Sequence, residues 1–187
     1  PNVEAATPVN VVDAQEIENT GVTNLIDAMT RQPQVGLGSS ASSTTNSVSG
    51  QGLATLNLRN LGSSRTLVLV NGRRHVAGSA GTSAVDVNSI SKTTIARIDT
   101  VTGGSSAVYG ADAVAGVVNF ITKKSVQDVT LHASTVQPEQ SGGGDQKRVT
   151  ILAGKGDLAT DGWNVYTAFS AQRRESLMQR DRPGIWD

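Results

Sequence analysis

The second part of the chain, from Ser125 onward, contains three long segments in which apolar and polar residues largely alternate. These segments are residues 129–135, 148–153 and 163–171, and polar turns join them. The alternation predicts strands with one apolar and one polar face, because successive side chains of a strand point to opposite sides of a sheet. Three such strands leave two unpaired edges, so this region requires neighbours.

The part of the chain up to about Lys124 predicts a compact α+β unit of short strands and short helices. Its predicted strands are the segments 9–12, 56–59, 67–70, 98–102 and 117–122, and in the second of these Leu56 and Leu58 alternate with polar residues. The run at 67–70 ends at Asn71-Gly72, a dipeptide that favours a tight type I′ reversal. Between residues 36 and 52 most positions are Gly, Ser or Thr, a composition that predicts a long solvated loop.

Two short helices are predicted near the N-terminus. Asp13 begins a pattern that resembles a capping box, and Gly21 ends the helix that it opens. Thr23 is expected to cap the second helix. That helix is expected to stop near Arg31, because Pro33 disfavours the helical conformation of the residue before it.

Aromatic residues are concentrated in the second part of the chain, which holds Trp163, Tyr166, Phe169 and Trp186. Alternating segments of about ten residues with aromatics toward their ends are typical of outer-membrane barrel strands. The same pattern also fits a soluble β-meander, so the alternation alone leaves both interpretations open.

Composition narrows the function classes. The 16 basic and 16 acidic residues are spread along the chain, so we expect no nucleic-acid partner. There is no cysteine and there are two histidines, which excludes disulfides and nearly every metal site of the usual ligand number. We therefore expect no metal and no cofactor. Short matches to catalytic motifs arise by chance in a serine-rich chain, so no catalytic residue is assigned and an enzyme is not expected.

Three blocks of the first part resemble, in order, the plug domain of TonB-dependent outer-membrane receptors. The first block runs from Pro8 to Val35, and the second comprises residues 58–62 and 66–72. The third block is residues 95–122, which include Gly103-Gly-Ser-Ser-Ala-Val-Tyr-Gly110 and are similar to the family's most recognisable stretch.

This resemblance implies a plug domain over residues 1–124, with a small mixed β-sheet and short helices. Residues 125–187 would then supply the first antiparallel strands of a transmembrane β-barrel that is incomplete in this chain. A barrel of about 22 strands with roughly ten residues each needs some 220 residues before any loops. We therefore expect the chain to be part of a longer receptor.

The function that the resemblance implies is transport without chemistry. The plug would gate the barrel lumen and help to bind a scarce nutrient for energised import into the periplasm, the candidates being an iron chelate, haem, cobalamin or a carbohydrate. Its partners would be TonB with the inner-membrane energising complex, the remainder of the barrel, the small nutrient ligand and the outer membrane of a Gram-negative cell. The plug would lie inside the lumen, facing the periplasm.

Two questions remain open at this point. The segment that contacts TonB is expected upstream of Pro1, so no residue of this chain is assigned to that contact. A stand-alone periplasmic binding or signalling module with a plug fold is the alternative to a receptor.

Two sets of basic residues are candidate site residues. Arg73, Arg74 and His75 follow the Asn-Gly reversal, where the resemblance implies a loop that faces the substrate. They are candidate contacts for an anionic ligand, or else solvated loop charges. Arg59 and Arg97 lie in two motif strands that the resemblance implies face the barrel wall. They are candidates for pairing with barrel carboxylates, or else ordinary exposed strand charges.

Overall fold

The computed structural model divides the chain into two compact units, Pro1–Lys123 and Lys124–Asp187. It describes residues 9–22, 24–36, 38, 52–103, 105–137 and 144–175. Most of the loop predicted at residues 36–52 lies outside these residues. None of the helices within the described ranges is long and apolar enough to cross a membrane.

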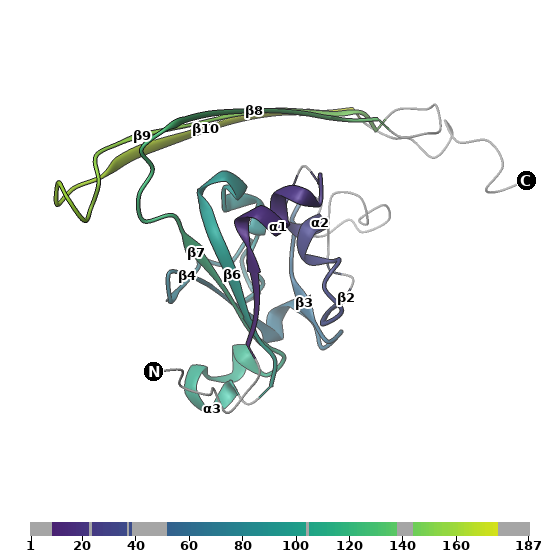
Figure 1. Ribbon diagram of the computed structural model, residues 1–187. Coiled ribbons are helices and arrows are strands. Elements are labelled where there is room, and N and C mark those ends of the chain that lie inside the picture. Colours follow the sequence, from purple (N-terminus) through teal and green to yellow (C-terminus); the bar gives the residue numbers. More distant parts are fainter. Residues whose placement is uncertain are drawn as a thin grey trace, which may run out of the picture. The chain divides into compact units, whose positions relative to one another are not determined.

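A five-stranded mixed sheet organises the first unit (Figure 1). The strand order is β1-β6-β7-β4-β5, and every neighbouring pair is antiparallel except β4 and β7, which run parallel. The strands are β1 (Val9–Asp13), β4 (Thr66–Val70), β5 (Arg73–Arg74), β6 (Ile95–Val101) and β7 (Gly116–Thr122).

The strands at the centre of this sheet are apolar on both sides. Residues 66–69 of β4 and 116–118 of β7 are all buried, because packed residues cover both faces of the sheet there. Buried and exposed residues alternate in β6 and β1 instead. Ile98 of β6 is buried while its neighbour Arg97 is exposed, and Val12 of the edge strand β1 is buried while Val11 is exposed.

Two α-helices follow β1, as the sequence predicts. Asp13 caps α1 (Ala14–Asn19), and its side chain accepts a hydrogen bond of 2.7 Å from the amide of Glu16. The N-cap of α2 (Leu25–Met29) is Asn24, whereas the sequence pattern suggested Thr23, which lies outside the described residues. The Asn24 carboxamide oxygen accepts from the amide of Asp27 at 3.1 Å and satisfies a free helix-terminal donor.

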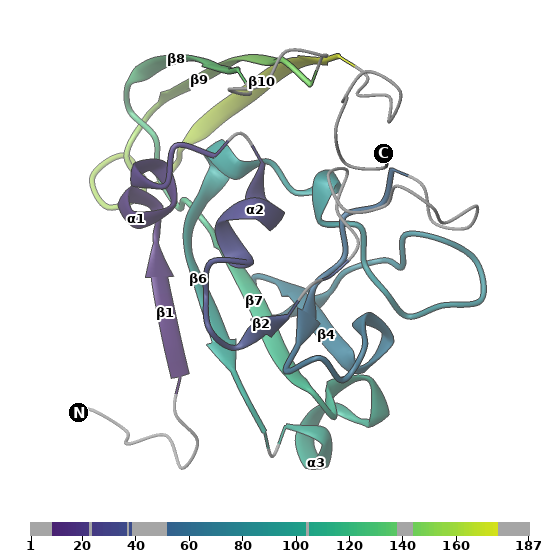
Figure 2. The same ribbon diagram turned by 90° about the vertical axis from the view of Figure 1, so that its right-hand side faces the viewer.

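Two hydrophobic clusters cover the opposite faces of the sheet. The larger cluster joins α1 and α2 to the face that carries Val68, Val118 and Phe120, and Figure 2 shows α2 lying across that face. The smaller cluster consists of Leu67, Leu69, Ala113 and Val117. Ala113 belongs to the 3-10 helix η4 (Ala111–Ala113), which follows α3 (Ser106–Tyr109).

Short elements complete the first unit. The strands β2 (Val35–Gly36) and β3 (Asn57–Leu58) pair with each other in a separate two-stranded sheet. Three further 3-10 helices are η1 (Ser63–Arg65), η2 (Val87–Ser89) and η3 (Lys92–Thr94).

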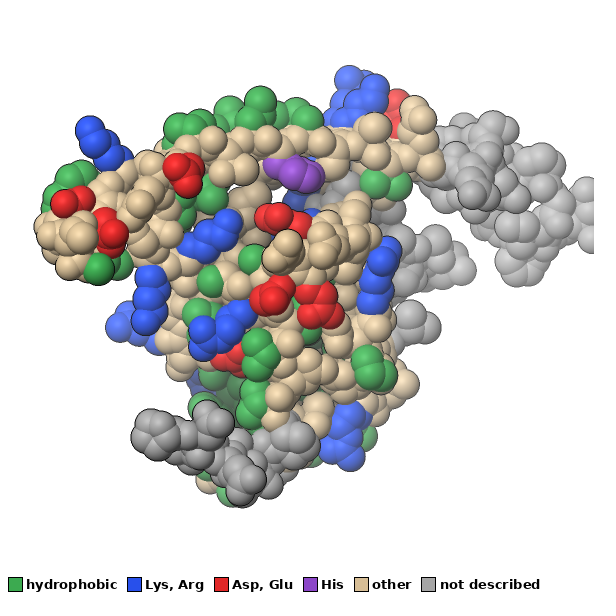
Figure 3. Space-filling model, viewed as in Figure 1, with side chains coloured by type: hydrophobic (Ala, Val, Ile, Leu, Met, Phe, Trp, Pro, Cys, Tyr) green, Lys and Arg blue, Asp and Glu red, His purple; other side chains and the backbone are tan. Residues whose placement is uncertain are grey.

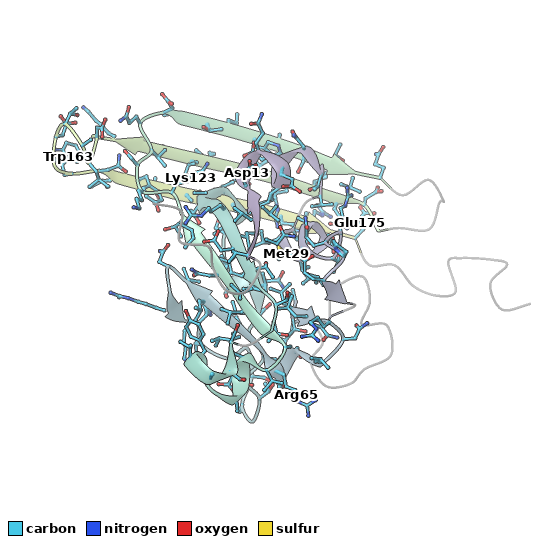
Figure 4. The ribbon with its side chains drawn as sticks, turned by 60° about the horizontal axis from the view of Figure 1, so that its bottom comes forward. Asp13, Met29, Arg65, Lys123, Trp163 and Glu175 are labelled. Carbon is cyan, nitrogen blue, oxygen red and sulfur yellow. The ribbon has the colours of Figure 1, made fainter. Side chains whose placement is uncertain are left out.

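The second unit is an open antiparallel sheet of three long strands in the order β10-β9-β8. The strands are β8 (Val129–Val136), β9 (Gln146–Lys155) and β10 (Val165–Arg174), and each contains most of one alternating segment seen in the sequence. Trp163 and Glu175 mark opposite ends of this sheet (Figure 4).

Candidate functional site

The Asn71-Gly72 turn forms the tip of the β4–β5 hairpin. Both residues have positive φ angles, 51° and 77°, which is the conformation of a type I′ turn. The turn joins Val70 to Arg73, which face each other across the two strands. The sequence prediction of a tight reversal at this dipeptide is confirmed.

Hydrogen bonds fix the tip of this hairpin to the end of β7. The Asn71 side chain accepts from the amide of Thr122 at 3.0 Å and donates to its hydroxyl at 2.9 Å. The amide of Gly72 donates to the Asn119 side chain at 2.9 Å. The position of the basic residues that follow is therefore set by β7 as well as by the turn.

The charge of Arg74 is already paired within the first unit. Its guanidinium lies 2.7 Å from a carboxylate oxygen of Asp112 and also donates to the backbone carbonyl of Tyr109. The two side chains of the ion pair are about half exposed, with relative exposures of 50% and 41%. Arg74 thus links β5 to the α3–η4 segment, and less of its charge is available to a ligand.

The two other predicted ligand residues lie on the same hairpin. Arg73 is exposed and precedes Arg74 in β5, so the two side chains point to opposite faces of the sheet. His75 is half-buried, and its amide donates to the carbonyl of Val68 at 3.1 Å. The three residues are consecutive on one hairpin, and among them Arg73 is exposed and takes no part in the ion pairs of the described residues.

The strand predicted at residues 56–59 is shorter in the structure, and Arg59 lies outside it. The strand β3 ends at Leu58, and Arg59 and Asn60 both adopt left-handed backbone conformations, with φ angles of 55° and 57°. The side chain of Asn57 accepts from the amide of Gly62 at 2.8 Å, which closes this turn. The prediction that Arg59 lies in a strand was therefore wrong. Its side chain is exposed.

Arg97 does lie in a strand, β6, and it has a carboxylate partner in the same strand. Its Nε donates to Asp99 at 2.9 Å. The two residues are separated by one position, so their side chains point to the same face of the sheet. The arginine side chain is half exposed and the aspartate 21% exposed.

The sheet of the second unit has one apolar face. The strand register places Leu131, Ile151 and Phe169 in one row across the sheet, and all three are exposed. Figure 3 shows hydrophobic side chains gathered along this face. The neighbouring rows of the same face are Val129, Ala153 and Thr167 on one side and Ala133, Val149 and Ala171 on the other.

Basic residues border this apolar band at both ends. Lys155 lies at the end near Trp163, and Lys147 pairs in register with Arg173 at the other end. The opposite face of the sheet is polar at its middle, where His132, Thr150 and Ser170 form a row. A surface that is apolar on one side, polar on the other and basic at its margins fits a lipid boundary.

The partner of Arg74 could not be found from the sequence. Asp112 lies 38 positions from Arg74 and carries no local signal that it would reach β5.

Within the described ranges, no group of three or more His, Cys, Asp or Glu residues could hold a metal ion.

A comparison with protein families decides what this arrangement is. Residues 1–117 match the family described as the TonB-dependent receptor plug domain. The chain belongs to this family. The α+β plug is followed by antiparallel strands, and this is the architecture that the sequence resemblance predicted.

Solved receptor structures share the fold over most of this plug-family chain. The siderophore receptor PirA from Acinetobacter baumannii is 30% identical, with a TM-score of 0.64 over 87% of the chain. PirA from Pseudomonas aeruginosa is 24% identical, with a TM-score of 0.67 over 92%. The ferric citrate transporter FecA, in its unliganded form, is 24% identical, with a TM-score of 0.71 over 91%. The likeness therefore continues beyond the plug into the strands of the second unit.

The chain spans less than a third of the length of these receptors. It covers 24% of the Acinetobacter PirA chain, 30% of the Pseudomonas PirA chain and 26% of FecA. All three are receptors or transporters rather than enzymes, which agrees with the absence of a catalytic assignment from the sequence.

Proposed function

We propose that the first unit is the plug of an outer-membrane active transporter and that the strands after residue 124 begin its barrel. The observation that carries the proposal is the apolar band of β8–β10, which follows a plug-family domain in the same chain. Such a band is not expected on a stand-alone periplasmic module, since a large exposed apolar patch promotes association in water.

The length of the band supports a membrane-spanning role. Lys155 and Lys147 border it on β9 and are eight residues apart, which corresponds to about 27 Å along a strand at ~3.4 Å per residue. A strand tilted by about 40° in a barrel then covers a height of roughly 21 Å, close to the ~25 Å apolar belt of outer-membrane barrels. The outer membrane of a Gram-negative cell is the location that this arrangement supports.

The proposed cargo is an anionic iron chelate, chosen from the iron chelate, haem, cobalamin and carbohydrate that the family resemblance allowed. Two of the similar structures are siderophore receptors and a third transports ferric citrate. Arg73 is the proposed ligand contact; Arg74, whose side chain points to the opposite face of the sheet, and His75 follow it on the hairpin. Because Asp112 already pairs with Arg74, the contribution of Arg74 to binding is smaller.

The proposed energy source is TonB with its inner-membrane energising complex. Force on a segment upstream of Pro1 would reach the first unit through β1, which is an edge strand held by β6 alone among the described strands. Movement of the plug would then open the lumen of the barrel. In this mechanism no bond of the ligand is made or broken.

Uptake of radiolabelled iron chelates by cells that carry the complete receptor tests this function. We expect uptake that requires both the receptor and TonB, and we expect Arg73→Glu to weaken binding of an anionic chelate through charge repulsion. Arg31→Glu is the matched control, because Arg31 is also an exposed arginine of the first unit but follows α2 and is not part of the hairpin. Uptake that is unchanged without TonB would contradict the proposal.

A further inference from the structure

The side chain of Asn164 joins three segments of the second unit. Its Nδ2 donates to the carbonyl oxygens of Val126, Lys155 and Gly156 at 2.8, 3.2 and 2.6 Å. Its Oδ1 accepts from the amide of Val126 at 3.2 Å. The carboxamide therefore holds both backbone groups of Val126, much as a neighbouring strand would.

This arrangement requires a carboxamide at residue 164. The donor side faces three carbonyl oxygens and the acceptor side faces an amide, so a carboxylate would place negative charge against the carbonyls. An alanine would leave the half-buried amide and carbonyl of Val126 without these partners. Neither substitution changes the size of the side chain enough to clash.

Gly154 keeps open the space that Val126 occupies. The Val126 side chain is 8% exposed, and a Cβ atom on Gly154 would lie 2.3 Å from the carbonyl oxygen of Val126 and 2.8 Å from its Cβ. Gly156 has a φ angle of 90°, and a Cβ there would lie 2.7 Å from the ring of Trp163. Any larger residue at position 154 therefore displaces Val126 from its place beside β9.

Val126 is also the first residue of the second unit that is held in this way. The amide of Lys123, the last residue of the first unit, donates to the carbonyl of Thr94 at 2.8 Å. Only Lys124 and Ser125 separate Lys123 from Val126, and both are exposed. Two residues therefore separate the last hydrogen-bonded residue of the first unit from the first residue that Asn164 binds.

We propose that Asn164 is a positioning residue that anchors the plug's exit segment to the barrel, so that tension applied to the plug ends at Val126. This inference rests on the proposed function, because it assumes that the plug is pulled. Without the anchor, the same tension would reach β8, which is an edge strand of the described sheet and open to peeling.

Amide hydrogen exchange in the full chain, held in detergent micelles, tests the anchor itself. We expect Asn164→Ala to speed exchange at the Val126 amide by at least about tenfold, since it removes the oxygen that accepts from this amide. Asn164→Asp keeps an acceptor oxygen but places negative charge against the three carbonyl oxygens, so it should speed exchange at the same amide by displacing the side chain. Gly154→Ala should have the same effect by displacing Val126 while Asn164 stays intact. Thr167→Ala, an exposed change on β10, is the control and should leave this amide unchanged. Equal exchange in all four variants would overturn the proposal.

Single-molecule pulling separates an anchor from an ordinary packing contact. One handle is attached at the N-terminus and the other at Thr160, an exposed residue of the β9–β10 turn, so that the load passes through Val126 and Asn164. In the wild type we expect the first unit to extend while β8 stays paired. In Asn164→Asp, residues 127–136 should be released as well, which adds about 36 Å of chain at ~3.6 Å per residue.

The two pulling outcomes are decisive in both directions. Release of β8 together with the first unit in the wild type contradicts the anchor. A held β8 in a receptor that transports without TonB would instead contradict the proposed function and leave the anchor standing, so the two failures can be told apart.

Discussion

The two phenylalanines of the chain show how differently its two units use apolar side chains. Phe120 lies in β7 of the first unit, is fully buried and belongs to the larger hydrophobic cluster. Phe169 lies in β10 of the second unit and is 62% exposed in the middle of the apolar band. The first unit covers both faces of its sheet with its own residues, whereas the second unit leaves one face for its surroundings to cover.

The two units are therefore expected to be stable in different environments. A domain that buries its own core folds in water, because burial of apolar area is the main driving force. A sheet with an open apolar face and open edges needs lipid, a partner strand or another copy. The predictions below test this division, beginning with the largest effect.

Phe120→Ala should strongly destabilise residues 1–124, which we expect to fold alone as a soluble domain. Removing a fully buried phenylalanine costs about 3–5 kcal/mol of unfolding free energy through lost burial and the cavity left behind. Urea unfolding of this domain measures the loss. A collapsed NMR spectrum of the wild-type domain would show that it is not independent and would break the comparison.

Phe169→Ala is the counterpart of this change in the second unit. Because the Phe169 ring is already exposed, we expect this substitution in the full chain to leave the unfolding free energy of the first unit unchanged in urea. A loss comparable to that of Phe120→Ala would mean that other residues bury the Phe169 ring when the full chain is in water.

Ile151→Lys should weaken insertion of the complete receptor into lipid vesicles. A lysine at the middle of a lipid-facing band costs about 2–4 kcal/mol. Ser170→Lys is the matched control, because Ser170 occupies the polar face in the neighbouring row. Similar losses in the two variants, read from folding titrations in vesicles, would show that the apolar face does not meet lipid.

Asn71→Ala should destabilise the isolated first unit by about 1–3 kcal/mol. Alanine disfavours the left-handed conformation and lacks the hydrogen bonds to Thr122. Asn71→Gly keeps the conformation and loses only the hydrogen bonds, so its effect should be smaller. Urea titrations of both variants give the comparison, and an order reversed from this one would contradict the type I′ argument.

Arg97→Ala should have the smallest effect on the isolated first unit, below about 1 kcal/mol, because its ion pair with Asp99 is exposed to water. If Arg97 also meets a barrel carboxylate, the same change should loosen the plug in the intact receptor. Protease accessibility of the plug, measured beside the unfolding of residues 1–124, tests this. Equal losses in both settings would show that Arg97 supports only the fold of the plug.

Much of the fold could be predicted because its signals are local. The apolar run at 67–70, the capping pattern at Asp13 and the Asn71-Gly72 turn each depend on residues close together in the sequence. The alternation after residue 125 likewise predicts strands with two unlike faces, and β8–β10 show this division.

The partners of the candidate site residues could not be predicted, because they depend on pairings across the chain. The Arg74–Asp112 ion pair exists only because β5 and the η4 segment meet at the same part of the sheet. Arg59 was assigned to a strand because Leu56 and Leu58 alternate with polar residues. Its left-handed backbone is set by the turn that Asn57 closes, which periodicity does not reveal.

The sheet order of the first unit sets a sequence of events during synthesis of the chain. Val12 pairs with Ile98, and Val68 pairs in parallel with Val118, so β1 has no sheet neighbour until β6 has been made, and β4 has only the short β5 until β7 has been made. Contacts between residues so distant in sequence slow folding. The edge strand β1 must therefore remain unpaired until β6 has been made, and one side of β4 must remain open until β7 follows, which suits the short length of both strands.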